Sequence, residues 1–131
     1  MHAVLLTGHG GLEKLEYKTD IKVPIPKDDE VLIKVSAAGI NNTDINTRTG
    51  WYSKSTNSDG GSWSGEAIKF PRIQGIDVCG TIVSAGSKIK SSRIGKRVIV
   101  RPMQTNPKNL ARPNMLTLGS ELNGAFAQYV R

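Results

Sequence analysis

Glycine and proline interrupt this chain along its whole length, and their spacing constrains the fold more than any other sequence feature. The 131 residues include 14 glycines and 6 prolines. Because both residues are unfavourable inside helices and common in turns, they divide the chain into short apolar segments. The pattern predicts one β-rich domain, a small barrel or sandwich of short strands rather than a bundle of long helices.

The clearest strand candidate is 30–38, where Val31, Ile33 and Val35 share one face and alternate with Leu32 and more polar residues. Further strands are expected at 2–6, 12–19, 78–83, 96–100 and 125–130. Two long polar or proline-rich stretches, 51–66 and 101–124, are expected to be loops, which are often functional at such lengths.

A short helix is expected over 43–49. The preceding asparagines and Thr43 are residues that cap helix starts, with Thr43 or Asn42 as the predicted N-cap. Asp44 then falls in the first turn, where a carboxylate interacts favourably with the helix dipole, and a structural role is expected for it. Gly50 ends the helix.

Composition excludes several classes of protein but does not indicate a function. No run of 18 apolar residues occurs, and the N-terminus lacks the layout of a secretory signal. The single cysteine, Cys79, excludes a disulfide framework and any zinc site built from several cysteines. A cytoplasmic protein with no membrane partner is expected.

The basic charge is concentrated in the second half of the chain. The formal net charge is +7, and residues 67–131 hold eleven basic and two acidic side chains. The basic second half of the chain could attract nucleic acid, an anionic cofactor or an acidic partner. The simpler interpretation is a lysine-rich surface exposed to solvent. The basic residues of 88–97 lack interleaved aromatics, so nucleic acid is not indicated as a partner.

Several short motifs follow one another in an order that resembles a known family. They are Ser36–Asn41 with Thr43 and Asp44, Gly75–Asp77 with Gly80, Gly95–Val98, and Gly124–Val130. This series closely resembles the N-terminal GroES-like domain of the medium-chain dehydrogenase/reductase family, the alcohol dehydrogenase-like proteins, and covers nearly all of residues 1–131. The resemblance implies a mainly β, partly open barrel with one or two short helices, which supplies the substrate side of an active site.

In that family a following Rossmann domain binds NAD or NADP, and no Gly-x-Gly-x-x-Gly motif occurs in this chain. The resemblance therefore implies that residues 1–131 are one domain of a longer, homodimeric enzyme acting on a small molecule. The domain alone is expected to be inactive. The substrate and the choice between NADH and NADPH stay open.

The resemblance also implies that zinc is absent. The positions that match the catalytic zinc ligands of the zinc-dependent branch are Asn41 and Ile76, and neither an amide nor an alkyl chain is a good zinc ligand. The structural zinc site of that branch needs four cysteines within about 101–124, and this stretch has none. The expected branch is the zinc-independent, quinone oxidoreductase-like one, which reduces quinones or activated alkenes.

Asn41, Thr43 and Tyr52 are the catalytic candidates, and Asn41, Thr43 and Arg48 are the candidates for contact with the cofactor; no metal ligand is expected. Each has a simpler structural alternative. Asn41 could form an Asx turn, Thr43 a helix cap, and Arg48 a solvated helix position. Tyr52 and its neighbour Trp51 could form a flat wall for a quinone ring or simply pack a loop onto the barrel.

A second class of function stays open, namely a GroES-like binding or assembly module without catalysis. Ring assembly would appear as a large oligomer in gel filtration, whereas the enzyme hypothesis predicts a monomer or a weak dimer. A third possibility, binding of RNA or protein through the basic half, would show a steep loss of affinity with salt.

Overall fold

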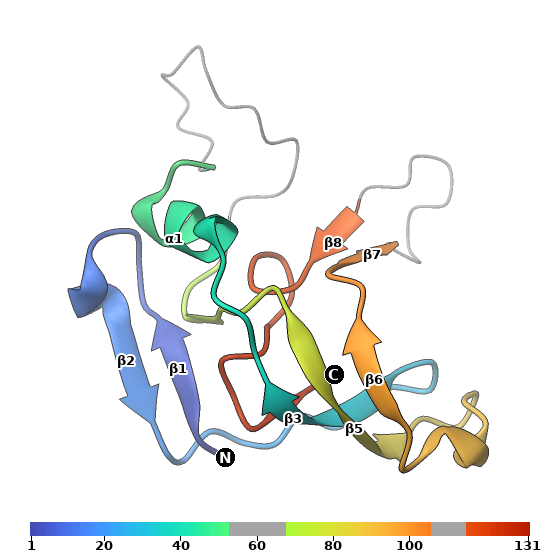
Figure 1. The fold of residues 1–131 in the computed structure, drawn as a ribbon. Helices are drawn as coiled ribbons and strands as arrows, with labels where there is room; N and C mark the ends of the chain where they lie inside the picture. Colours follow the sequence, from blue (N-terminus) through green and yellow to red (C-terminus); the bar gives the residue numbers. More distant parts are fainter. Residues whose placement is uncertain (53–67, 106–114) are drawn as a thin grey trace.

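The structure is a computed structural model that describes residues 1–52, 68–105 and 115–131. Within these residues, nine short strands form three antiparallel sheets, accompanied by one α-helix and two 3₁₀ turns (Figure 1). The predicted mainly β, partly open barrel with one short α-helix is confirmed. More strands form than the sequence pattern indicates, because several are only two or three residues long.

The first sheet has the order β2-β1-β4. Strand β1 is Ala3–Leu6, β2 is Leu15–Lys18 and β4 is Arg72–Ile73. The 3₁₀ turn η1, Leu12–Lys14, takes up the start of the segment expected to be a strand over 12–19, so β2 is shorter than predicted.

The second sheet has the order β6-β5-β3-β9 and carries most of the core. Its strands are β6 (Arg97–Val100), β5 (Val78–Ala85), β3 (Val31–Ala37) and β9 (Tyr129–Val130). Runs of β-branched residues favour these strands. The connection from β5 to β6 contains the 3₁₀ turn η2, Ser91–Arg93.

The register between β3 and β5 shifts between Leu32 and Ile33. Simple alternation predicts that these neighbours face opposite sides and that Leu32 lies away from the core. Both are buried, with 8% and 5% of their surface exposed. The alternation of β3 is nevertheless kept, because Ile33 belongs to the core cluster and Leu32 does not, so Leu32 is buried on the other face of the strand. The extra residue at the register shift lies on β5, where Ser84 pairs with Leu32 and Ile82 with Ile33.

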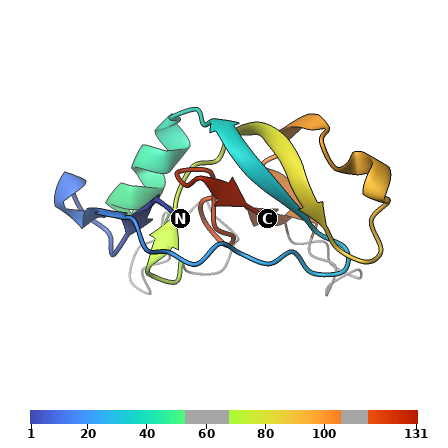
Figure 2. The same ribbon diagram turned by 90° about the horizontal axis from the view of Figure 1, so that it is seen from below.

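The C-terminal segment joins the two larger sheets (Figure 2). Ala127 forms a bridge to Ala3 of β1, and β9 then pairs with β3. Only Tyr129–Val130 is a regular strand, so the strand expected over 125–130 is too long. The earlier part of this segment divides its hydrogen bonds between two sheets and cannot form one ladder.

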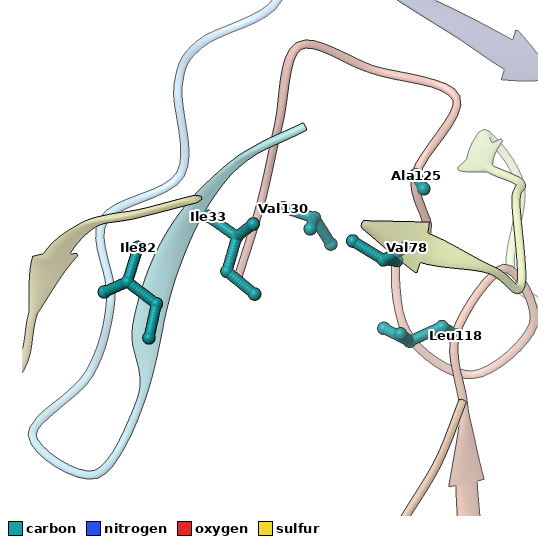
Figure 3. Packing of buried hydrophobic residues seen from close by; sticks show 6 residues of the cluster. All are labelled: Ile33, Val78, Ile82, Leu118, Ala125 and Val130. Carbon is teal, nitrogen blue, oxygen red and sulfur yellow. The ribbon is translucent and has the colours of Figure 1, made fainter. Parts of the chain in front are cut away.

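The hydrophobic core lies on the inner face of the second sheet (Figure 3). Strands β3, β5 and β9 contribute to it, together with the chain on either side of residue 120. Its buried members are Ile33, Val78, Ile82, Leu118, Ala125 and Val130.

Two strands occur where one continuous loop is expected over 101–124. Strand β7, Met103–Thr105, pairs with β8, Met115–Thr117, to form a small two-stranded sheet. The prediction of a loop is wrong at these positions, because the prolines lie between or beside the paired residues. Residues 106–114 lie outside the described residues, as does the predicted loop over 51–66 apart from Trp51 and Tyr52.

Candidate functional site

Helix α1, Asn42–Thr49, follows β3 and ends at Gly50, which has the left-handed φ of 81°. The sequence predicts Asn42 or Thr43 as the N-cap of this helix, but the N-cap is Asn41. Asn41 has an extended backbone, and its N–H donates to Oδ2 of Asp44 at 2.9 Å. Asp44, three residues after the cap, therefore supplies the acceptor that the open start of the helix requires.

Asp44 also fastens the helix to the segment that leads into β5. Its Oδ1 accepts from the backbone N–H of Gly75 at 3.2 Å. Its backbone carbonyl accepts from the side-chain amide of Gln74 at 2.9 Å. Only 6% of Asp44 is exposed, and this burial raises the pKa of its carboxyl, although the backbone donors act in the opposite direction. Its expected structural role agrees with these contacts.

Gly75 allows the segment 74–76 to lie directly against the C-terminal chain. Its φ is 102°, and a Cβ at this position would lie 2.8 Å from the backbone nitrogen of Ala125. The Ala125 N–H donates to the Gly75 carbonyl at 2.9 Å. Both the left-handed conformation and the close approach require glycine.

The two positions that match zinc-ligand positions, Asn41 and Ile76, are brought near each other by a hydrogen bond from Asn41 to Asp77. The side-chain amide of Asn41 donates to Oδ2 of Asp77 at 2.9 Å, and Ile76 is the adjacent residue. Among the described residues there is no group of three or more His, Cys, Asp and Glu side chains that could hold a metal ion.

A shallow pocket opens beside α1; its cavity volume is about 20 Å³, and the space not filled by atoms, open solvent included, is about 310 Å³. Helix α1, the turn after it, the segment before β5 and the end of β8 form its wall. The lining residues are Thr43, Asp44, Thr47, Tyr52, Ile76 and 117–120. Most of the lining side chains carry a hydroxyl group and Asp44 adds a carboxyl group, while Ile76, Leu118 and the ring of Tyr52 form the apolar part of the wall. Such a wall can form hydrogen bonds with a small organic molecule and also contact its apolar part.

The structure brings two of the four predicted site residues into this pocket, Thr43 and Tyr52. Asn41 and Arg48 are not among the lining residues. The Arg48 guanidinium donates to the Gly10 carbonyl at 2.7 Å, and the Gly10 N–H donates back to the Arg48 carbonyl at 2.9 Å. The catalytic and cofactor roles of all four residues stay predictions.

Asn46 and Trp51 both contact the side chain of Tyr52. The Asn46 amide donates to its hydroxyl oxygen at 3.2 Å, and the Trp51 ring stacks on its ring at a centroid distance of 5.7 Å and an angle of 25°. Trp51 is 71% exposed. Tyr52 lines the pocket and Trp51 does not, and the choice between a wall for a substrate ring and packing of the loop stays open.

Sequence reasoning missed Thr47 and the segment 117–120. Thr47 follows Thr43 by four residues, which places both on one face of a helix, so helical spacing could have found it. Nothing local marks 117–120, which reaches the pocket through segments distant in the chain: β8 pairs with β7, and Gly119 lies against Gly75.

Comparison with known proteins agrees with this architecture. Residues 27–131 match the family of alcohol dehydrogenase GroES-like domains. Over 98 residues, which are 75% of this chain, the chain is 38% identical to the human quinone oxidoreductase and covers 26% of that protein. Over the same length it is 36% identical to the chloroplastic NADPH-dependent alkenal/one oxidoreductase of Arabidopsis thaliana and covers 22% of that protein.

A solved structure from Sinorhizobium meliloti 1021, provisionally assigned as an alcohol dehydrogenase, is also similar. It matches with a TM-score of 0.83 and 42% identity, over 99% of this chain and 37% of that one. The fold is thus that of a GroES-like domain. The chain belongs to the alcohol dehydrogenase GroES-like domain family of medium-chain dehydrogenases/reductases, in the quinone oxidoreductase-like branch.

This chain spans about a quarter of the length of the quinone oxidoreductases that it matches. Within the part of the chain that the structure describes, no helix is long and apolar enough to cross a membrane.

Proposed function

We propose that this domain forms the substrate side of the active site in a zinc-independent, NAD(P)H-dependent oxidoreductase that reduces quinones or activated alkenes. The observation that carries the proposal is the pocket beside α1, which Thr43, Tyr52 and Ile76 all line. An aromatic ring and an alkyl side chain suit a planar apolar substrate, and a hydroxyl can bind its carbonyl oxygen.

The chain's own residues would bind and orient the substrate. Bound NAD(P)H would supply a hydride to the electrophilic carbon, while a proton is delivered to the product from solvent or a neighbouring hydroxyl. Thr43 donates a hydrogen bond to the substrate oxygen, where negative charge develops during hydride transfer. Tyr52, held by Asn46, fixes the plane of the ring.

Asn41 and Arg48 are proposed to contact the cofactor from outside this pocket. The side-chain nitrogen of Asn41 donates to Asp77, and the side chain also takes part in the capping box at the start of α1, so a contact with the cofactor would replace one of these interactions. Arg48 lies in the last turn of α1, and its cation suits a cofactor phosphate. The cofactor-binding domain itself is proposed to lie in another part of a longer, homodimeric protein in the cytoplasm.

Zinc independence follows from the chemistry of the side chains at the junction. A catalytic zinc needs three protein ligands among thiolate, imidazole and carboxylate groups. Asn41 brings an amide and Ile76 an alkyl chain, and the carboxylates of Asp44 and Asp77 beside them both accept hydrogen bonds from Asn41. These residues do not fit a zinc ion.

The test uses the intact protein that carries this domain. Oxidation of NADPH and NADH is followed with phenanthrenequinone and with an alkenal, before and after dialysis against a chelator. We expect reduction with at least one cofactor, unchanged activity after chelation, and no stoichiometric zinc. One zinc per chain would contradict zinc independence, and a large inactive oligomer in gel filtration would favour an assembly module instead.

Substitution connects the activity to the pocket. Thr43→Val should lower kcat/KM about tenfold, because a hydrogen bond to developing charge is lost. The matched control is Thr49→Val, at an exposed threonine of the same helix whose hydroxyl donates to the Asn46 carbonyl at 3.2 Å. Equal activity of the two variants would remove Thr43 from the proposed site.

A further inference from the structure

Thr117 is the last residue of β8, and both its backbone N–H and its backbone carbonyl form hydrogen bonds. Its N–H donates to Oε2 of Glu121 at 2.8 Å. Its carbonyl accepts from the N–H groups of Ser120 and Leu122, at 3.2 and 3.1 Å. The backbone of Thr117 is therefore held by its own turn, and its side chain has a defined direction.

The hydroxyl of Thr117 is buried and has no hydrogen-bond partner among the described residues. Only 3% of the residue is exposed. Buried hydroxyl groups are paired in the large majority of cases, so an unpaired one calls for an unseen partner. Because Thr117 also lines the pocket beside α1, a molecule in that pocket is a candidate for this partner.

Among the described residues one other buried side-chain atom lacks a hydrogen-bond partner, Nε of Arg72, and it does not compete as a site. Its guanidinium already donates through Nη1 to Oδ1 of Asn123 at 3.1 Å, and Arg72 is not among the residues that line the pocket. Thr117 is thus the position where an unpaired buried polar atom and the pocket coincide.

We infer that Thr117 is a substrate-binding residue whose hydroxyl forms a hydrogen bond with a carbonyl oxygen of the bound substrate. The inference rests on the proposed function and adds a second hydroxyl to the one that Thr43 supplies. Thr43 approaches from α1 and Thr117 from β8, so the substrate oxygen would be recognised from two separate elements. Neither threonine needs to form a covalent bond with the substrate.

Thr117→Val tests the inference, because valine keeps the shape of threonine and lacks the hydroxyl. In the intact protein we expect the KM for phenanthrenequinone to rise about tenfold, as for the loss of one hydrogen bond. The melting temperature should not fall, since the hydroxyl has no described protein partner. Thr117→Ser should keep the wild-type KM.

The matched control is Thr105→Val, at an exposed threonine of the paired strand β7. This control should leave KM unchanged. A Thr117→Val variant with a lower melting temperature and an unchanged KM would overturn the inference, because the hydroxyl would then be serving the fold alone.

A binding measurement separates this inference from the proposed function. In protein labelled at threonine methyl groups, the NMR signal that disappears in Thr117→Val belongs to Thr117. Titration with cyclohexanone, an unreactive carbonyl probe, should shift this signal. A shifted signal in a protein that reduces neither test substrate would support the inference while the proposed function fails. An active protein with an unshifted signal would overturn the inference alone.

Discussion

Removing the Asp44 carboxylate should separate the two segments that form the pocket. In Asp44→Ala, the N–H groups of Asn41 and Gly75 lose the oxygens to which they donate at 2.9 and 3.2 Å. An unpaired buried donor costs about 1–3 kcal/mol, so the two together cost about 2–6 kcal/mol. Relief of the buried charge offsets part of this cost. We therefore expect a net loss of about 2–4 kcal/mol in the free energy of unfolding.

In Asp44→Asn one side-chain oxygen remains to accept a hydrogen bond, but the NH₂ group faces the other backbone N–H donor. The free energy of unfolding should therefore fall by about 1–2 kcal/mol. The substitution should also alter the pH dependence. Burial raises the pKa of Asp44 above its ordinary value of 3.8, so the folded protein binds this proton more tightly than the unfolded chain. The free energy of unfolding should therefore fall as the pH rises from that ordinary value through the raised one, and stay level above it.

Urea unfolding followed by circular dichroism over a series of pH values measures both effects. The informative quantity is the difference between wild type and Asp44→Asn, since other carboxyl groups cancel in it. The control Asp29→Asn, at an exposed aspartate, should keep the wild-type pH profile. Parallel profiles for wild type and Asp44→Asn would refute the pH argument, and an Asp44→Ala variant within about 0.5 kcal/mol of wild type would refute the structural one.

Two further predictions concern stability and are checked by melting temperature. Gly75→Ala should destabilise the domain by about 3 kcal/mol or more, because it combines a left-handed φ with a contact of 2.8 Å to the Ala125 nitrogen. Gly8→Ala, where a Cβ meets only one side-chain atom at 4.0 Å, should change it little, and equal effects would contradict the argument. Ile82→Ala, at 1% exposure, should cost about 2–5 kcal/mol, whereas Ile99→Ala, at 85% exposure, should stay within about 0.5 kcal/mol. If Ile99→Ala destabilised the domain more than Ile82→Ala, the hydrophobic core would not lie where Ile82 is buried.

The regular elements were the most predictable part of the fold. Strands β3, β5 and β6 lie where β-branched residues cluster between glycines, and α1 lies where capping residues precede Gly50. These signals are local, because the preference of each residue for strand, helix or turn acts within a few positions. Errors of a residue or two at the ends, such as the N-cap at Asn41, are expected of such signals.

Features that depend on partners distant in the chain were not predictable. The register shift opposite Leu32 and Ile33 appears only when β3 is aligned with β5. Strands β7 and β8 are three residues each and carry too little local preference to be recognised without their pairing. For the same reason Thr117 had no signal in the sequence as a pocket residue.

By itself, the sequence determined the β-rich class, the helix beside the predicted site, the family, and the residue types at the junction of Asn41 and Ile76, because each depends on residue identity and short spacing. Tertiary structure alone decided which side chains share the pocket. Asp44 could be seen to start a helix, but only folding brings the Gly75 N–H to its carboxylate, 31 residues away in the chain, and so places α1 against the segment before β5. A contact across that distance depends on the path of the whole chain, which no local pattern encodes.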